Sequence, residues 1–454
     1  MMNGNHETLK VDIMAYTPIG PLFTDLYELT MAAGYFARSM SAEATFSLFV
    51  RDCAERNFFV AAGLEDVLRE LSVLAFSKDD LAYLESTGLF GADFLSHLEG
   101  IRFTGEVRAM PEGSIFFPEE PILEVTASII EAQIIETFLL NTVGFQTLIA
   151  SKAARCVHAA AGRPLIDFSL RRTQGRDGGM TVARSSYLAG FSAISNVLAG
   201  RRYDLPVSGT MAHSFVQTFP DEEDAYAAFA EVFPDNSVFL IDTYDTVEGA
   251  RLAARVGNAM KQHGASLKGV RLDSGDMIAL SRQVRRVLDH AGLPGVQIYA
   301  SSGFDEFKIS ETLAGGAPID AFGVGTKMGV SADAPYMDIV YKLVRFNGRD
   351  VRKLSPGKAT LSGRKQVFRR SDHHGRYQAD TIGLADEHLE GHLPLLQTVM
   401  TGGKISDARP SLDHIRDRFR RNFSMLGDDY KSLDEKKVYP VRVSRALQAI
   451  QESQ

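Results

Sequence analysis

A histidine follows closely on a short apolar run of this sequence. Asp204 to Ser208 (Asp-Leu-Pro-Val-Ser) is typical of a short strand, Gly209 and Thr210 end it, and His213 precedes a helix-like stretch. In α/β proteins the loops after parallel strands line the substrate crevice. A neutral imidazole there can act as a base, a metal ligand or a phosphate acceptor. The alternative is a histidine that caps the following helix and donates to a carbonyl group.

Acidic side chains follow two later apolar runs. Asp242 and Asp245 come at and just after the end of one run, and Asp273 ends the next. Mg²⁺ takes few protein oxygens and keeps several waters, so Asp242 and Asp273 together could hold a Mg²⁺ that a diphosphate also ligates. The alternative is that such aspartates cap the helices that follow them, which we expect for Asp245 and Asp276.

Small residues gather where the last two apolar runs end. They are Ser301-Ser302-Gly303 and Gly323-Val324-Gly325-Thr326. Small side chains let backbone N–H groups approach an anion, and the start of the next helix adds a favourable dipole. The arrangement is similar to the phosphate site that α/β barrels often build from their last loops. Neither cluster is a Rossmann fingerprint, and the sequence contains no GxxxxGK motif.

Three arginines accompany these runs. Arg171 and Arg172 follow one run, and Arg271 lies inside another. A buried guanidinium needs an anion, and its flat pair of donors suits a carboxylate or a phosphate. The alternative for Arg271 is a salt bridge to a strand-end aspartate such as Asp242. A group of lysines could also grip phosphates, although such lysines usually lie on a solvated face: Lys342, Lys353, Lys358 and Lys365.

Residues 151–335 must position these side chains. Short apolar runs alternate there with helical stretches, which implies parallel strands joined by crossover helices. So many repeats, with an acid, Ser, Thr or Gly at nearly every strand end, favour a closed, TIM-like parallel α/β barrel over an open sheet. The predicted strands are 165–170, 205–208, 237–243, 269–274, 296–302 and 319–324, and the predicted helices are 182–198, 221–233, 246–263, 276–291 and 305–314.

The flanking segments have a different pattern. Residues 1–20 are predicted to be a leader, and residues 21–150 an α+β domain with a capped helix at Thr24–Tyr35 and a strand at Ala44–Val50. Residues 336–454 are predicted to pack back on that domain. They contain a hairpin, Ile339 to Phe346 turned at Asn347-Gly348, and an amphipathic helix at Ser411–Leu426.

Composition excludes several classes of protein. The 454 residues are 45% hydrophobic and 23% charged, as in a soluble globular protein, and the net charge of −8 argues against a nucleic-acid-binding surface. The longest apolar run, Ala127 to Ala150, is broken by polar residues, so we expect no membrane span. The only two cysteines, Cys53 and Cys156, fit buried free thiols in a reducing compartment, and we expect a cytoplasmic protein.

Taken together, the strand-end motifs resemble those of nicotinate phosphoribosyltransferases. The resemblance runs from Thr24 to about Arg369, and its specificity comes from the joint order of the motifs. They are Thr24-Asp-Leu-Tyr-Glu-Leu-Thr-Met31, Asp167-Phe-Ser-Leu-Arg-Arg172, Gly209-Thr-Met-Ala-His-Ser214, Asp242-Thr-Tyr-Asp245, Val270-Arg-Leu-Asp-Ser-Gly-Asp276, Ser301-Ser-Gly303, Phe322-Gly-Val-Gly-Thr326 and Lys353-Leu-Ser-Pro-Gly-Lys358.

The resemblance implies a type II phosphoribosyltransferase: an irregular α/β barrel plus an α+β domain from N-terminal and C-terminal pieces. It also implies a homodimer with shared active sites that makes nicotinate mononucleotide and diphosphate from nicotinate and 5-phosphoribosyl 1-diphosphate, for NAD salvage. ATP would phosphorylate His213, and turnover of the phosphohistidine would drive the reaction.

The resemblance also assigns roles to individual residues. For nicotinate, Tyr27 of the second subunit and Phe168 would sandwich the ring, while Arg171, Thr210 and Arg271 would line its pocket. For the phosphoribosyl diphosphate, the implied residues are Asp242 and Asp273 with Mg²⁺, Ser302, Gly303, Gly325 and Thr326 around the 5-phosphate, and Arg51 and Lys342 at the diphosphate. The sequence leaves open whether Arg171 or Arg172 faces the ring.

Three alternatives remain at this point. The same fold could act on nicotinamide or quinolinate; a neutral Asn196, near a position where nicotinamide-using relatives carry an acid, favours nicotinate. A second alternative is a phosphate-sensing barrel without turnover, against which the joint presence of His213, Asp242 and Asp273 speaks. A third is a barrel aldolase or isomerase with a Schiff-base lysine, but no predicted strand ends in a buried lysine.

Overall fold

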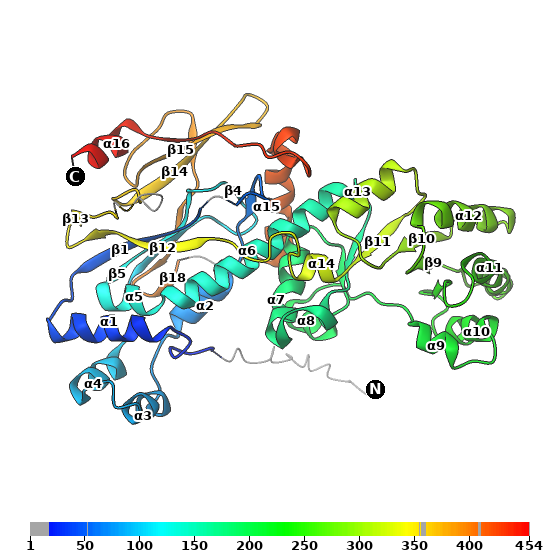
Figure 1. Ribbon diagram of the computed structural model, residues 1–454, viewed down its shortest axis with the longest axis horizontal. Helices are drawn as coiled ribbons and strands as arrows, with labels where there is room; N and C mark the ends of the chain where they lie inside the picture. Colours follow the sequence, from blue (N-terminus) through cyan, green and yellow to red (C-terminus); the bar gives the residue numbers. More distant parts are fainter. Residues whose placement is uncertain (1–17, 52, 354, 356–359, 407–409, 454) are drawn as a thin grey trace, which may run out of the picture.

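The computed structural model describes residues 18–51, 53–353, 355, 360–406 and 410–453. Most of the predicted leader, and Lys358 of the lysine group, lie outside these residues. The molecule is elongated, with antiparallel strands at one end and parallel strands with their crossover helices at the other (Figure 1).

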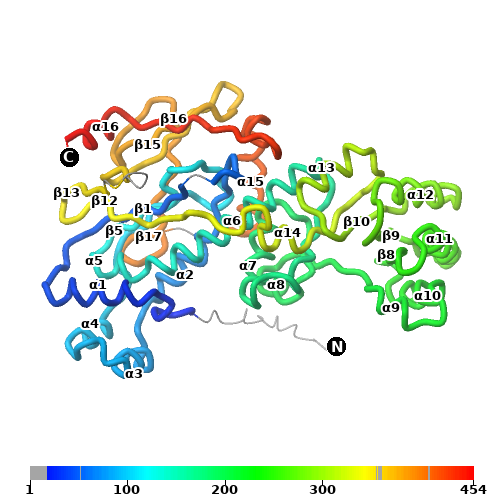
Figure 2. Tube along the Cα trace, viewed as in Figure 1, coloured from blue at the N-terminus to red at the C-terminus, as the bar shows by residue number. Residues whose placement is uncertain are grey.

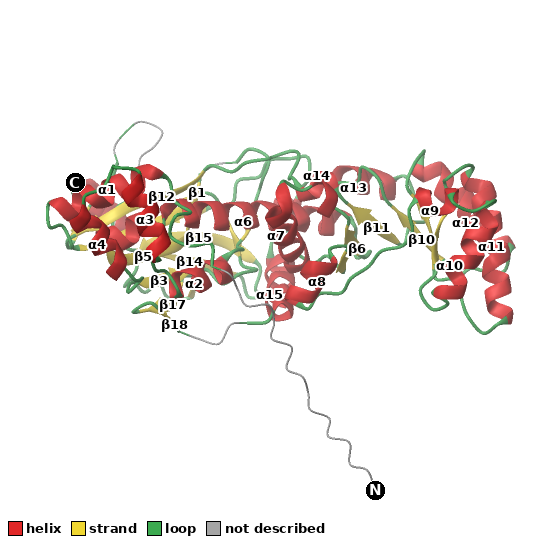
Figure 3. Ribbon diagram, turned by 90° about the horizontal axis from the view of Figure 1, so that it is seen from below, coloured by secondary structure: helices red, strands yellow, loops and turns green. Residues whose placement is uncertain are grey.

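The parallel sheet has six strands in the order β7-β6-β11-β10-β9-β8, and each neighbouring pair is parallel. These strands are β6 (Leu165–Asp167), β7 (Ala193–Ile194), β8 (Val238–Leu240), β9 (Gly269–Leu272), β10 (Gln297–Ala300) and β11 (Ala321–Val324). The associated helices are α7 (Gly175–Leu188), α8 (Val197–Tyr203), α9 (His213–Gln217), α10 (Glu222–Val232), α11 (Thr246–Gln262), α12 (Met277–His290), α13 (Glu306–Ala314) and α14 (Thr326–Gly329). Helices α10, α11 and α12 gather beyond β10 at one end of the molecule (Figure 3).

Aspartates begin most of the crossover helices. The side chains of Asp221, Asp245, Asp276 and Asp305 each accept a hydrogen bond from a backbone N–H of the first turn, which satisfies a donor that the helix cannot pair internally. The predicted capping role of Asp245 and Asp276 is therefore confirmed.

The predicted parallel α/β architecture is confirmed, but a fully closed barrel is not. Among the described residues the hydrogen-bonded ladders form one curled sheet with β7 and β8 at its edges. The predicted strand at 205–208 is wrong, since that segment contributes a single bridge between Ile194 and Val207. Pro206 has no N–H to donate, and Asp204 takes a left-handed backbone (φ 54°), so the segment cannot extend a ladder.

The predicted helix over 182–198 is confirmed for residues 182–188 and is wrong as one continuous helix. Helix α7 ends at Leu188, the chain turns at Gly190 with φ 108°, and β7 and then α8 follow. A positive φ is readily reached by glycine and ends a helix. The turn lets Ala193 and Ile194 pair with Ile166 and Asp167 at the edge of the sheet.

Strands from both ends of the chain share a seven-stranded sheet in the order β13-β12-β1-β5-β3-β17-β18 (Figure 2). They are β1 (Glu43–Val50), β3 (Glu106–Ala109), β5 (Pro121–Ser128), β12 (Ile339–Phe346), β13 (Arg349–Asp350), β17 (Gln397–Thr401) and β18 (Lys404–Ile405). The strand predicted at Ala44–Val50 and the hairpin at Ile339–Phe346 are confirmed. Smaller sheets join β14 (Lys365–Ser371), β15 (Tyr377–Leu384), β16 (His392–Pro394) and β19 (Val441–Val443), and β2 (Phe59–Val60) with β4 (Ile115–Phe116).

One long helix, α6 (Glu136–Ala159), connects the two parts. Its first half packs Phe138, Leu139 and Val143 into the core of the antiparallel part, and its second half packs Ile149 and Ala153 into the core around the parallel strands. The other helices are α1 (Leu26–Ala37), α2 (Leu64–Ser72), α3 (Lys78–Ser86), α4 (Ala92–Gly100), α5 (Ile129–Ile134), α15 (Leu412–Met425) and α16 (Arg445–Glu452). The predicted helices at Thr24–Tyr35 and Ser411–Leu426 are thus confirmed, but the predicted cap of the first is not, since the side chain of Asp25 at its N-terminus accepts no capping hydrogen bond from a described residue.

Two further expectations concern the whole chain. Cys53 and Cys156 are buried free thiols, as predicted. No helix in the described part of the chain combines the length and the apolar character that crossing a bilayer requires.

Candidate active site

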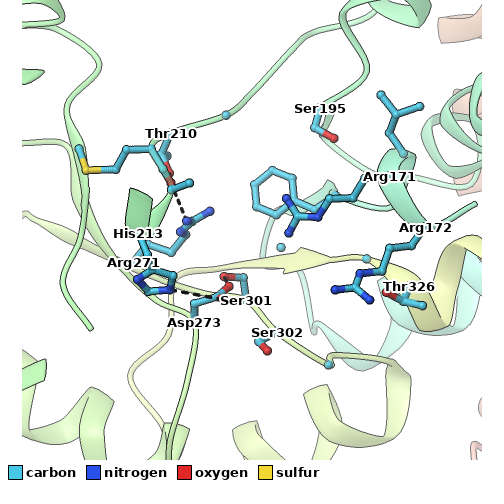
Figure 4. Close-up of a pocket in the computed structure, with 18 residues that line it drawn as sticks. Arg171, Arg172, Ser195, Thr210, His213, Arg271, Asp273, Ser301, Ser302 and Thr326 are labelled. Atoms are coloured by element: carbon cyan, nitrogen blue, oxygen red, sulfur yellow. Dashed lines mark hydrogen bonds and ion pairs between the residues drawn. The ribbon is translucent and has the colours of Figure 1, made fainter. Parts of the chain in front are cut away.

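A cavity of about 640 Å³ opens where the parallel strands end (Figure 4). Most of the residues that the sequence singled out lie on its walls: Phe168, Arg171, Thr210, His213, Arg271, Asp273, Ser302, Gly303, Gly325 and Thr326. Segments that are far apart in the sequence meet here because the carboxyl ends of parallel strands share one edge of a sheet.

His213 is the first residue of α9 and lies between two strand ends. Its Nδ1 is 3.1 Å from Oγ1 of Thr243, and its Nε2 is 4.0 Å from Oδ2 of Asp273. The side chain is 41% exposed, so a small molecule can reach it. The imidazole therefore has one nitrogen held by a hydroxyl group and the other directed toward the cavity and a carboxylate.

Asp273 and Asp242 occupy different layers of the site. Asp273 lines the cavity, and its Oδ1 accepts a hydrogen bond from Oγ of Ser301 at 2.5 Å. Asp242 lies behind it and is not among the wall residues; its Oδ2 accepts from the backbone N–H of Asp273 and from Oγ of Ser274, both at 2.7 Å. Oδ1 of Asp242 is buried and has no hydrogen-bond partner among the described residues.

Arg271, in β9, carries an incompletely paired guanidinium. Its Nη2 donates to the carbonyl oxygen of Met211 at 2.8 Å, but its Nε is buried without a hydrogen-bond partner in the described structure. Burial, and secondarily the charge of Arg171, lower the pKa of the Arg271 guanidinium, while Asp273 and Asp242 act in the opposite direction. No ion pair joins Arg271 to Asp242 among the described residues, so the predicted alternative does not hold. A buried donor without a partner is costly and is well suited to an anionic ligand.

A short 3₁₀ turn, Leu170–Arg172, brings two more arginines to the wall. The guanidinium groups of Arg171 and Arg172 point into the cavity (Figure 4), and neither forms an ion pair with a described residue. Together with Arg271 they face a single wall carboxylate, that of Asp273. The cavity therefore has an excess of positive charge.

The ring of Phe168 packs directly against the backbone of Gly323. A Cβ on Gly323 would lie 2.5 Å from the Phe168 ring, closer than real contacts allow, so only glycine fits at that point of β11. The backbone N–H of Phe168 donates to the carbonyl oxygen of Val324 at 2.8 Å, which fixes the residue at the strand end. An aromatic face is thus fixed on the cavity wall.

The two small-residue loops form another wall. Ser302 and Gly303 both have a left-handed backbone, with φ 81° and 67°, and the strain at Ser302 is typical of functional loops. Lys327 binds Asp305 at 2.8 Å and so ties the start of α14 to the start of α13. The loops that carry Gly303 and Thr326 are therefore held together as one unit.

Three predicted residues lie elsewhere in this chain. Tyr27 is on α1, and Lys342 on β12 is 4.0 Å from Oε1 of Glu136. Burial first, and then the charge of Glu136, raise the pKa of Tyr27. Arg51 pairs with Asp338 at 3.3 Å. None of the three is on the described walls of the cavity, and α1 and β12 lie with the antiparallel strands (Figure 1).

Comparison with known proteins agrees with these motifs. Three family descriptions match the chain: the nicotinate phosphoribosyltransferase N-terminal domain over residues 22–144, the nicotinate phosphoribosyltransferase family over 164–380, and the nicotinate phosphoribosyltransferase C-terminal domain over 390–451. The chain belongs to the nicotinate phosphoribosyltransferase family. The resemblance drawn from the strand-end motifs is confirmed.

Individual relatives cover nearly the whole chain. Nicotinate phosphoribosyltransferase pncB2 of Mycobacterium tuberculosis is 48% identical, over 94% of this chain and 92% of the relative. Nicotinate phosphoribosyltransferase of Bacillus subtilis is 38% identical, over 93% and 92%. The crystal structure of human nicotinic acid phosphoribosyltransferase superposes with a TM-score of 0.84 at 30% identity, covering 95% of this chain and 99% of that one. The structure of nicotinate-nucleotide pyrophosphorylase from Pyrococcus furiosus has a TM-score of 0.73 at 27% identity, over 93% and 99%.

Some residues of the site were missed from the sequence. Ser195 and Met211 line the cavity, and Thr243 contacts His213. The sequence does not identify Ser195 as a site residue because its segment is predicted as part of one helix over 182–198. Gly190 is the signal that could have indicated the end of that helix. Thr243 ends a predicted strand and belongs to the motif Asp242-Thr-Tyr-Asp245, but a hydrogen bond to the distant His213 leaves no signature in the local sequence.

Proposed function

We propose that this chain transfers the 5-phosphoribosyl group of 5-phosphoribosyl 1-diphosphate to nicotinate, with release of diphosphate and coupling to ATP hydrolysis through a phosphohistidine at His213. The observation that carries the proposal is the charge of one cavity, in which Arg171, Arg172 and Arg271 face a single wall carboxylate beside His213. Nicotinate and phosphoribosyl diphosphate are both anions, and guanidinium groups suit carboxylates and phosphates.

Nicotinate would bind between Phe168 and the arginines. The ring face of Phe168 suits a flat pyridine, and Arg271 offers a buried Nε that has no partner among the described residues. A carboxylate there would satisfy that donor, and Arg171 and Thr210 line the same wall. The neutral amide of nicotinamide would not match the positive charge as well.

The 5-phosphate would bind at the two small-residue loops. Ser302, Gly303, Gly325 and Thr326 bring backbone N–H groups and hydroxyls to one wall, held together by the pair of Lys327 and Asp305. Small residues allow the close approach that a phosphate requires. Positive character then develops at the anomeric carbon as the diphosphate leaves, and positive groups around the diphosphate favour that step.

The carboxylate of Asp273 suits a divalent cation. It lines the cavity, and its Oδ2 accepts no hydrogen bond from a described residue. Mg²⁺ commonly uses one or two carboxylates together with substrate phosphates. Asp273 would hold the ion, with Asp242 behind it, and Mg²⁺ there would offset the charge of the departing diphosphate. Because the described residues contain no cluster of three or more candidate ligands, substrate oxygens and water would have to complete the coordination of the ion.

A homodimer would bring in the residues that this chain keeps away from its own cavity. Tyr27 is 46% exposed on α1, although the resemblance assigns it to the ring, and Arg51 and Lys342 also lie on the antiparallel part. A second copy could supply all three side chains to the cavity. An isologous dimer would then contain two such sites.

The decisive experiment offers the enzyme three pyridines in competition. Purified protein is given phosphoribosyl diphosphate, Mg²⁺ and equal concentrations of nicotinate, nicotinamide and quinolinate, with and without ATP, and the nucleotides formed are separated by chromatography. We expect nicotinate mononucleotide, formed faster when ATP is present. A preference for nicotinamide or quinolinate would overturn the substrate assignment, and a rate independent of ATP would overturn the coupling.

A further inference from the structure

Thr243 is the only described residue that hydrogen-bonds Nδ1 of His213, at 3.1 Å. It follows Asp242 in the loop after β8 and is not among the described residues that line the cavity. We propose that Thr243 is a positioning residue, which holds Nδ1 and thereby makes Nε2 the atom of His213 that accepts a phosphoryl group. The inference rests on the phosphohistidine of the proposed function. It adds that Nε2 is the nitrogen of His213 that reacts and that Thr243 is the residue that leaves this nitrogen open.

The two ring nitrogens have different surroundings. Whichever way its hydroxyl hydrogen points, Oγ1 of Thr243 lies 3.1 Å from Nδ1, so a phosphorus atom cannot bond that nitrogen without displacing the hydroxyl group. Nε2 lies on the cavity side, 4.0 Å from Oδ2 of Asp273, a distance that leaves it free of a hydrogen bond. Only Nε2 is therefore open to a ligand.

The frame that carries Thr243 is rigid. Its neighbour Asp242 accepts hydrogen bonds from the backbone of Asp273 and from Ser274, and the N–H of Ile241 donates to the carbonyl oxygen of Arg271 at 3.1 Å. These bonds lock the ends of β8 and β9 together. A side chain on such a frame can fix a ring orientation, as outer hydrogen bonds do for catalytic and metal-binding histidines.

The hydroxyl of Thr243 can also accept a proton from Nδ1, which is the tautomer that reacts. When Nδ1 keeps its proton and donates it to Oγ1 of Thr243, Nε2 has the free lone pair. That lone pair attacks the γ-phosphorus of ATP: the N–P bond forms, the bond from the γ-phosphorus to the β–γ bridging oxygen breaks, and ADP leaves with the electron pair. Hydrolysis reverses the change, because water attacks the phosphorus, the N–P electron pair returns to Nε2, and orthophosphate departs.

The test compares wild type, Thr243→Val and Thr243→Ser. Valine has the shape of threonine without the hydroxyl, and serine restores the hydroxyl. Thr218→Val is the matched control, since Thr218 follows the same short helix and its hydroxyl bonds only the carbonyl oxygen of Phe215. Each protein is incubated with ATP labelled at the γ-phosphate, and the rate at which the phosphoenzyme forms is measured. ³¹P NMR then distinguishes phosphorus on Nε2 from phosphorus on Nδ1.

We expect wild type to carry phosphorus on Nε2. Loss of one hydrogen bond of about 1.4 kcal/mol predicts about tenfold slower phosphorylation and a lower ATP-driven kcat in Thr243→Val. We expect the KM for nicotinate to be unchanged, Thr243→Ser to recover most of the rate, and Thr218→Val to match wild type. Phosphorus on Nδ1 of wild type, or an unimpaired Thr243→Val, would overturn the inference while leaving the phosphohistidine in place. Absence of any phosphoenzyme in wild type would overturn the proposed coupling, and this inference with it.

Discussion

The backbone N–H of Asp273 donates a hydrogen bond of 2.7 Å to Oδ2 of Asp242. One carboxylate of the predicted pair therefore lies on the cavity wall, and the other holds the backbone of the first. Asp242 also accepts from Ser274, so its principal contacts are with the turn after β9. This relationship separates two roles that the sequence could not separate, because Asp242 and Asp273 both come at strand ends.

Asp242→Ala is expected to lower the activity, because it removes the hydrogen bonds that hold the backbone of Asp273 and the side chain of Ser274 in the turn after β9. A hydrogen bond to a charged group contributes about 1.5–3 kcal/mol, so we expect kcat/KM for phosphoribosyl diphosphate to fall by about 10- to 150-fold. Asp242→Asn keeps an acceptor oxygen at the turn and is expected to lose less. Steady-state kinetics of both variants, compared with Asp273→Asn, check this. Equal losses in Asp242→Asn and Asp242→Ala would instead indicate that the charge of Asp242 acts directly.

Arg271→Ala is expected to affect nicotinate far more than ATP. In this variant the carboxylate of nicotinate loses its charge-assisted contact with the guanidinium group, which is worth about 2–3 kcal/mol. The Kd for nicotinate is therefore expected to rise by about 30- to 150-fold. Isothermal titration with nicotinate and with ATP measures the difference. Arg286→Ala is the control, because Arg286 lies on the outer groove between α11 and α12. Parallel losses for both ligands would assign Arg271 a structural role.

A buried ion network predicts acid sensitivity. Lys152 binds Oε2 of Glu306 at 2.5 Å and Oδ1 of Asp333 at 2.7 Å, and Arg56 binds Asp333 at 2.6 Å. Burial alone would raise the pKa of Asp333, but the hydrogen bonds and charges of Arg56 and Lys152 outweigh it and hold the pKa below its ordinary value. A depressed pKa stabilises the fold above the unfolded pKa of about 3.9, and this stabilisation is lost as the pH falls through the folded value.

Asp333→Asn tests that contribution. Breaking a buried pair costs about 3–5 kcal/mol, so we expect this loss in the free energy of unfolding at pH 7 and a shrinking difference from wild type below about pH 4. Urea unfolding followed by circular dichroism at several pH values measures it. Asp417→Asn, which removes an exposed pair with Arg420, should cost less than about 1 kcal/mol. A difference that stays constant down to pH 3 would contradict the prediction.

Glu120 predicts the opposite trend. Burial first, and then the charge of Asp380, raise the pKa of Glu120 well above its ordinary value. A raised carboxyl pKa stabilises the fold below the unfolded pKa, and this contribution is lost as the pH rises toward the folded pKa. Glu120→Gln keeps a neutral group there. We expect the melting temperature of wild type to fall relative to that of Glu120→Gln between pH 5 and pH 8. Scanning calorimetry measures both melting temperatures, and a difference between them that does not change with pH would contradict the prediction.

The sequence predicted the chemical groups of the site better than the structure of the segments between the main helices and strands. The end of β9 carries Arg271 and Asp273 into the cavity because a parallel sheet brings its carboxyl ends to one edge, and alternating apolar runs reveal that topology. His213 reaches the same cavity as the first residue of α9, although the described segment before it forms no strand. Segments without a local pattern were mispredicted. Strand β7 has two residues, too few for a period, and Pro206 limits its neighbour to one bridge.

Long-range placement was a further limit. The separation of Asp242 from the cavity wall depends on two hydrogen bonds that no spacing in the sequence reveals. The placement of Tyr27 away from the cavity is likewise a property of the packing of α1, which shares a core cluster with β1 and α5 through Leu29 and Ala32. Local pattern determines elements, and packing between distant segments determines which residues meet.

The proposed sharing of active sites between two subunits predicts that two defective variants complement each other. Tyr27→Ala would damage the site of the neighbouring subunit, whereas His213→Ala would damage the site of its own. Each homodimer alone is expected to lack most ATP-driven activity. When the two are unfolded together and refolded, about half of the dimers are mixed, and each mixed dimer has one intact site, so about a quarter of wild-type activity should return. Refolding each variant alone is the control, and no recovery in the mixture would show that Tyr27 does not act across a dimer.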